Sequence, residues 1–202
     1  MGVLDFSTGR TLVKVKDRQG LDRADSSVWV GAQRVAEIAY LNSGTSGDAD
    51  SKAGSVRIAL WNAESGELAG SVEAANAVWI CASPDGKHLA EAGSDKRVRI
   101  RSAQTLEVER EFRCHEARLT GVAWHPTKPL LVTKAEDGII RVWNLETLQK
   151  MEAFDSPSHR PARSDDKRFF RLEITADGRE LNVYRQNHTV LVFCPESFQG
   201  TK

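Results

Sequence analysis

One recurring segment constrains this chain more than any other feature of its sequence. Four stretches end alike: SVRIALWNAESGEL (Ser55–Leu68), RVRIRSAQTLEV (Arg97–Val108), IIRVWNLETLQK (Ile139–Lys150) and TVLVFCPESFQG (Thr189–Gly200). Each is an alternating apolar and polar run followed by a polar turn, which is typical of a short, half-buried β-strand. Their matching positions recur about every 40 to 50 residues, at Trp61, Arg101, Trp143 and Phe193. The chain is therefore predicted to be built from one repeated unit.

A second landmark precedes the last three of these segments. It is a strand that runs into a turn containing Pro or Gly: VWICASPDGKHLA, GVAWHPTKPLLV and FRLEITADGREL. When these turns are superposed, the units align without a gap from Trp79, Gly121 and Arg171 onward. The first unit is looser, with SVWVGAQRVAEIAYL (Ser27–Leu41) in place of the turn. Each unit contains four short strands and no helical period, so the predicted fold is all-β, made of four-stranded antiparallel blades.

The repeats resemble the WD-repeat β-propeller family. Blades of that family end a strand in Trp-Asp, where this chain has Trp143-Asn144 and Trp61-Asn62. They place a Gly-His pair before the first strand, where this chain has Cys114-His115. The resemblance covers about residues 27–198 and implies a β-propeller with about four blades in this chain. Neighbouring blades are expected to supply each other's core, because one blade alone buries too little apolar surface.

The expected organisation is one propeller domain or propeller fragment over residues 1–202. Its predicted parts are the end of a blade that completes the ring (1–17), three blades (27–72, 73–114 and 115–163) and an incomplete blade (164–202). A strand at Thr11–Lys16 could dock beside Thr189–Phe193 and close a four-bladed ring without a free edge. Rings of this family usually contain more blades. We therefore expect a part of a larger ring, or a half that pairs with a second chain.

Four residues of the third unit align with the family's structural tetrad: His115, Thr133, Asp137 and Trp143. A Thr, a His and an Asp together would also suit a nucleophile, a base and an orienting group. However, the indole N–H of the Trp would occupy the Thr hydroxyl, and no Gly-rich oxyanion turn adjoins it. We therefore predict a buried hydrogen-bond chain and no catalytic residue. Asp137→Ala is expected to lower the free energy of unfolding by about 2 kcal/mol.

The other units depart from this tetrad. In the second unit the aligned residues are Glu73, Glu91, Asp95 and Arg101. These three carboxylates either form a substitute charge network around the one guanidinium or are solvated, and the sequence leaves both readings open. In the fourth unit the tetrad is lost, because the aligned residues are Asp165, Val183, Asn187 and Phe193.

Two insertions lie in loops that the resemblance places on one rim of the propeller, its top face. They are Asn42–Ser55 and Asp155–Arg168. Loops on a rigid scaffold commonly carry binding residues. The candidates for partner binding are Lys96, Glu136, His159, Arg160, Arg163, Lys167 and Arg168. Arg160 and Arg163 are favoured as binding hot spots. Acidic neighbours cancel half of the charge in the second insertion, so a solvated loop is the alternative.

Charge and composition exclude several other classes of function. The chain has 28 Lys plus Arg and 28 Asp plus Glu, so net charge gives no argument for nucleic acid or an anionic membrane. Three distant cysteines without CxxC spacing support neither a disulfide framework nor a zinc site. No metal-ligand spacing or cofactor fingerprint is present, so no cofactor is expected. Without a signal peptide or an apolar span, the expected localisation is cytoplasmic.

The resemblance implies a non-catalytic scaffold that binds a protein or peptide partner on its top rim. Self-association to complete the propeller is also expected, whereas a membrane or nucleic-acid partner is not. One alternative is a propeller hydrolase or lactonase with a metal in its central channel. This alternative would need inward carboxylates or histidines from several blades. Another alternative is binding of an anion or nucleic acid through the basic loop at residues 159–171.

Overall fold

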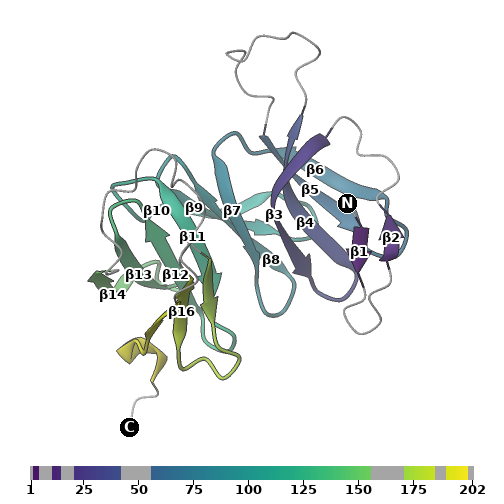
Figure 1. Ribbon diagram of the computed structural model, residues 1–202. Helices are drawn as coiled ribbons and strands as arrows, with labels where there is room; N and C mark the ends of the chain where they lie inside the picture. The colour runs from purple at the N-terminus through teal and green to yellow at the C-terminus, as the bar shows by residue number, and fades with distance from the viewer. Residues whose placement is uncertain are drawn as a thin grey trace.

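Apart from one short 3-10 helix, every regular element in the described residues is a β-strand. The computed structural model describes residues 2–4, 11–14, 21–41, 56–155, 171–184 and 190–199 (Figure 1). These residues contain no helix with the length and apolar character needed to cross a bilayer. The predicted all-β fold is therefore confirmed.

The strands form successive antiparallel sheets, each made from neighbouring segments of the chain. Blade 1 contains β3 (Leu21–Val30), β4 (Arg34–Leu41), β5 (Val56–Asn62) and β6 (Leu68–Glu73). Blade 2 contains β7 (Ala77–Ala82), β8 (His88–Gly93), β9 (Arg97–Ser102) and β10 (Val108–Arg113). Blade 3 contains β11 (Leu119–Trp124), β12 (Leu130–Ala135), β13 (Ile139–Asn144) and β14 (Lys150–Asp155). Blade 4 contains β15 (Leu172–Ile174), β16 (Leu181–Tyr184) and β17 (Val190–Phe193), followed by the 3-10 helix η1 (Glu196–Phe198).

After the third strand of blades 1 to 3, a short polar residue stands where the family has the Asp of Trp-Asp. This residue still makes the turn. The Asn144 side-chain oxygen accepts the amides of Glu146 at 2.8 Å and of Thr147 at 3.1 Å. Asn62 and Ser102 accept two amides in the same way in blades 1 and 2. Any short side chain with an acceptor oxygen can make this turn. The fourth strand begins directly after this turn.

The hydrophobic cores lie between the blades. One cluster joins blades 1 and 2 and includes Ile58 and Ile80. A second joins blades 2 and 3, and a third joins blades 3 and 4. The first strands of the blades (β3, β7, β11 and β15) follow one another along the hub of the propeller, and each contacts the next. This arrangement follows from the repeat, because each sheet uses both faces for burial against its neighbours.

The predicted closing strand takes a different partner. β2 (Thr11–Lys14) pairs with β1 (Gly2–Leu4) in a two-stranded sheet, and β17 pairs with β16. The docking of Thr11–Lys16 beside Thr189–Phe193 is therefore not found among the described strands. Figure 1 shows β1 and β2 beside blade 1, on the side away from blade 4. The first blade also begins earlier than predicted, at Leu21, because β3 extends along β4 through two bulges.

Candidate functional site

The four tetrad residues of blade 3 meet in one buried hydrogen-bond chain. The Trp143 indole N–H donates to the Thr133 hydroxyl over 2.9 Å. The same hydroxyl lies 2.9 Å from Nε2 of His115, whose Nδ1 lies 3.1 Å from the Asp137 carboxylate. With the Trp as donor, the Thr hydroxyl donates to Nε2, and Nδ1–H then donates to Asp137. The chain thus ties the loop before blade 3 to β12, β13 and the turn between them.

Electrostatics keep this chain in one protonation state. Burial lowers the pKa of His115, and the nearby Arg141 guanidinium acts in the same direction, so the ring is neutral at pH 7. Burial alone would raise the pKa of Asp137, but the Ile139 amide and the His115 ring outweigh it and lower that pKa. Because Thr133 is 0% exposed, its hydroxyl cannot meet a substrate. The geometry is that of a structural lock.

Blade 2 has a charge network at the corresponding place, with a different centre from the one expected. Glu91, 1% exposed, lies 2.6 Å from Nε of Arg101. Three carboxylates surround a guanidinium, but that guanidinium belongs to Arg99, which contacts Glu91 at 3.3 Å, Asp95 at 2.5 Å and Glu111 at 2.7 Å. Of the two readings left open by the sequence, the charge network holds for Glu91 and Arg101, which are buried. Glu73 is exposed on β6, as the solvated reading has it.

Blade 1 contains a polar pair that the sequence reasoning missed. The Trp61 indole N–H donates to the Glu37 carboxylate over 3.0 Å, and the two residues are 2% and 1% exposed. The strand register pairs Val35 with Trp61 and Leu131 with Trp143, so Glu37 occupies the place of Thr133. A single Glu inside the apolar run RVAEIAYL was the available signal. The 42–55 insertion hid the equivalence, because it breaks the spacing to Trp61.

Blade 4 replaces the polar lock with apolar packing. Val183 is fully buried, and Phe193 packs against Phe154 of blade 3 with ring centroids 5.0 Å apart. The other two aligned residues, Asp165 and Asn187, lie outside the described residues. Blade 4 is also tied to blade 3 through His125, whose Nε2–H donates to the Gly178 carbonyl over 2.9 Å.

The loops of the predicted top rim are bonded to one another through their backbones. The β8–β9 turn joins the loop before β7, since the Ser94 amide donates to the Asn76 carbonyl over 2.7 Å. The β12–β13 turn joins the loop before β11 in the same way, through the Glu136 amide and the Arg118 carbonyl at 2.9 Å. These turns and loops therefore emerge at one end of the blades. We call this set the top rim.

Two of the predicted partner-binding residues lie on this rim. Glu136 is exposed, and Lys96 is partly exposed in the β8–β9 turn. Lys96 has φ 72°, and the equivalent residue of blade 3 is Gly138 with φ 75°. A side chain strains this left-handed conformation, which glycine adopts freely. The remaining candidates lie outside the described residues: His159, Arg160, Arg163, Lys167 and Arg168.

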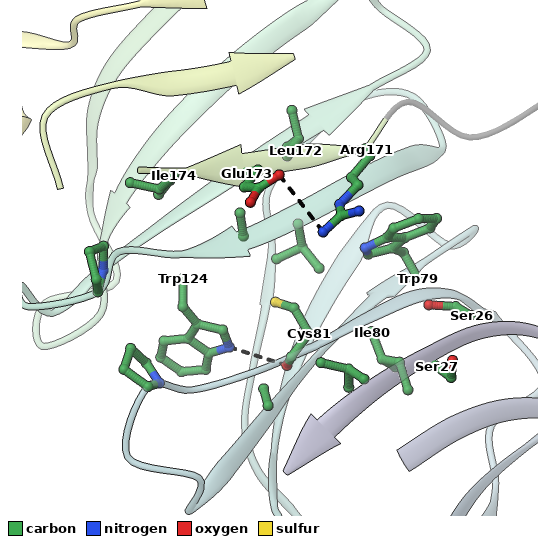
Figure 2. A pocket seen from close by; sticks show the side chains of 16 residues that line it. Ser26, Ser27, Trp79, Ile80, Cys81, Trp124, Arg171, Leu172, Glu173 and Ile174 are labelled. Atoms are coloured by element: carbon green, nitrogen blue, oxygen red, sulfur yellow. Dashed lines mark hydrogen bonds and ion pairs between the residues drawn. The ribbon is translucent and has the colours of Figure 1, made fainter. Parts of the chain in front are cut away.

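A cavity of about 510 Å³ lies at the hub, and we call it the hub cavity (Figure 2). All four blades line it through their first strands, β3, β7, β11 and β15. Its walls include two indoles, Trp79 and Trp124, and an ion pair between Arg171 and Glu173 at 3.7 Å. The Trp124 indole N–H donates to the Cys81 backbone carbonyl over 3.3 Å.

The hub cavity is lined mainly by apolar and aromatic residues. Among the described residues that line it, Glu173 is the only carboxylate and none is a histidine. Burial raises the pKa of the Cys81 thiol, so this sulfur is not a thiolate nucleophile at pH 7. The described residues contain no group of three His, Cys, Asp or Glu side chains that could hold a metal ion. The lining suits a ligand that is mostly apolar.

Neighbouring blades share hydrophobic cores, and blades 1, 2 and 3 each bury a polar pair at the third strand. This is the architecture of a WD-repeat β-propeller. Comparison with known families agrees with this class. The family described as "WD domain, G-beta repeat" matches residues 66–102 and 106–144, which run from the fourth strand of blade 1 to the third strand of blade 3. These two matches identify WD repeats in the chain, and its curated relatives include a WD repeat-containing protein.

Curated relatives match only part of the chain and a smaller part of themselves. WD repeat-containing protein 90 of Xenopus tropicalis is 26% identical over 132 residues, covering 58% of this chain and 7% of that protein. Protein HIR1 of Cryptococcus neoformans is 31% identical over 104 residues, covering 52% of this chain and 12% of that protein. Target of rapamycin complex subunit wat1 of Schizosaccharomyces pombe is 30% identical over 105 residues, covering 50% of this chain and 33% of that protein.

Solved structures share the fold at low sequence identity. The computationally designed Ika4 protein superposes with a TM-score of 0.61 and 18% identity, over 92% of this chain and 98% of that one. The structure of U3-55K superposes with a TM-score of 0.60 and 18% identity, over 89% of this chain and 54% of that one. These similarities establish the fold alone.

Proposed function

We propose that the chain is a non-catalytic scaffold that binds a protein or peptide segment on its top rim. The observation that carries this proposal is the conformation of Lys96. A lysine stands where glycine would be less strained, on a rim whose loops are fixed by backbone hydrogen bonds. Strain retained on a rigid surface is typical of a residue kept for contact with a partner. Glu136 offers a charge of opposite sign on the same rim.

Similarity to relatives supports an assembly role. Wat1 is by name a subunit of a complex, and it matches half of this chain. The candidates in the second insertion, above all Arg160 and Arg163, would extend the same surface. Their role in binding remains a prediction. Cytoplasmic localisation also stays a prediction.

The test is a quantitative affinity purification with charge reversal on the rim. The double variant Lys96→Glu and Glu136→Lys reverses both charges without changing the net charge. Its matched control is Glu146→Lys with Lys150→Glu, two exposed residues at the opposite end of blade 3. We expect the rim variant to lose specific partners by roughly tenfold and the control to retain them. Equal recovery of specific partners by the rim variant and the control would refute partner binding on the top rim.

We further propose that the chain self-associates through the edge of blade 4. Among the described strands β17 pairs only with β16, whereas the third strands of blades 1 to 3 pair on both edges. Val192 of β17 is 56% exposed, and an apolar edge strand readily takes a further strand. Val192→Lys should shift the mass measured by light scattering from dimer to monomer. A wild-type chain that is monomeric at high concentration would contradict self-association.

A further inference from the structure

We propose that the hub cavity binds an extended peptide segment in which an aromatic side chain stands next to a carboxylate. This site is separate from the top rim, and it does not depend on the rim proposal. Three features of the cavity carry the proposal: its aromatic walls, its charged mouth and its strand edges.

The walls offer ring faces to an aromatic side chain. Trp79 comes from β7 and Trp124 from the neighbouring strand β11. Because the Trp124 N–H is already bonded to the Cys81 carbonyl, Trp124 presents its ring and not its donor (Figure 2). Pro84 and Pro126, at equivalent places in blades 2 and 3, extend this apolar wall. Aromatic pairs in offset or edge-to-face contact stabilise such an insertion beyond the area that they bury.

The charged mouth favours an anionic group beside that aromatic side chain. The Arg171 side chain is 67% exposed, and its contact with Glu173 is long at 3.7 Å. Glu173 is also engaged by the Tyr184 hydroxyl, whose pKa this hydrogen bond raises. Arg171 also lies over the Tyr184 ring, 6.0 Å from its centroid. A guanidinium has five N–H donors, so Arg171 keeps donors for the two oxygens of a carboxylate.

The strand edges favour a peptide over a small free acid. Each strand that lines the cavity is the edge strand of its sheet. The contact from Trp124 shows that a backbone carbonyl of β7, that of Cys81, accepts a donor from outside its own ladder. An extended peptide can supply donors and acceptors to such edges. A volume of about 510 Å³ accommodates one large side chain and its neighbour.

The experiment titrates the full chain with short blocked peptides and follows the tryptophan indole N–H signals by NMR. The probes are Ac-Gly-Phe-Asp-Gly-NH2, its Phe-to-Ala form and its Asp-to-Lys form, together with free phenylacetate. The test variant is Arg171→Glu, and the matched control is Arg179→Glu. Arg179 is 76% exposed in the β15–β16 turn and does not line the cavity.

We expect the Phe-Asp peptide to shift the indole signals of Trp79 and Trp124 and to leave that of Trp29 in place. The other probes should bind roughly tenfold more weakly. Arg171→Glu should reverse the preference in favour of the Phe-Lys peptide, and Arg179→Glu should bind as wild type does. Equal affinity for the Ala and Phe peptides, or an unchanged charge preference in Arg171→Glu, would overturn the proposal. Equal binding of phenylacetate would show that the site does not select a peptide.

Discussion

Replacing Thr133 by Val tests whether the blade 3 hydrogen-bond chain stabilises the fold. Valine keeps the volume of threonine but lacks the hydroxyl that joins Trp143 and His115, each at 2.9 Å. Both partners are buried, at 8% and 2% exposure, so water cannot replace the hydroxyl. A buried polar group without a partner costs about 1–3 kcal/mol. Two such groups, with partial relaxation, give an expected loss of about 3 kcal/mol in the free energy of unfolding.

The assay is urea unfolding followed by tryptophan fluorescence, with Thr120→Val as the matched control. Thr120 lies on β11 of the same blade, and its hydroxyl makes one long bond, 3.3 Å, to the Lys134 carbonyl. With a slope of about 2 kcal/mol per molar urea, Thr133→Val should lower the midpoint by about 1.5 M. Thr120→Val should change it by less than about 0.5 M. Equal midpoint shifts for the two variants would refute the reasoning.

Three further predictions concern the buried charges and the strained turn. Glu91→Gln should destabilise the chain by about 3 kcal/mol because it strands Arg101, and Glu91→Leu with Arg101→Met should restore most of this loss in the same urea assay. Burial lowers the pKa of His115 and of His125, so the unfolded chain binds more protons below about pH 6.5. The melting temperature should therefore fall between pH 7 and pH 5.5, and fall less in His125→Gln. Lys96→Gly should stabilise the chain by about 0.5–1 kcal/mol, and an unchanged or lower melting temperature would contradict strain there.

The parts of the fold that the sequence predicts best are those where spacing alone sets the geometry. Blades 2 and 3 have short loops and align without a gap, so the register of each strand follows from the alternation of apolar residues. The four tetrad positions then come together because the β12–β13 register brings Thr133 near Trp143, and the Asp137 turn faces the loop of His115. The resemblance to WD repeats predicts this arrangement from the sequence alone.

The parts that could not be predicted depend on how side chains from distant segments meet. Alternation places Arg99 and Arg101 on one face of β9. The β8–β9 turn then decides that Asp95 contacts Arg99, and the β9–β10 register decides that Glu111 does. The hub cavity needs the positions of four first strands at once, and Trp79 and Arg171 are far apart in sequence. The closing strand was predicted from the resemblance alone, and among the described strands β2 pairs with β1 instead.

Hydrogen exchange of the tryptophan indole protons tests most directly whether the third strands of blades 1 and 3 end in a buried polar lock. Trp61 and Trp143 donate to Glu37 and Thr133 and are 2% and 8% exposed, whereas Trp29 is 44% exposed. Stacked blades predict that the indole protons of Trp61 and Trp143 exchange at least roughly a hundredfold more slowly than that of Trp29. Similar exchange rates for all three would contradict the account.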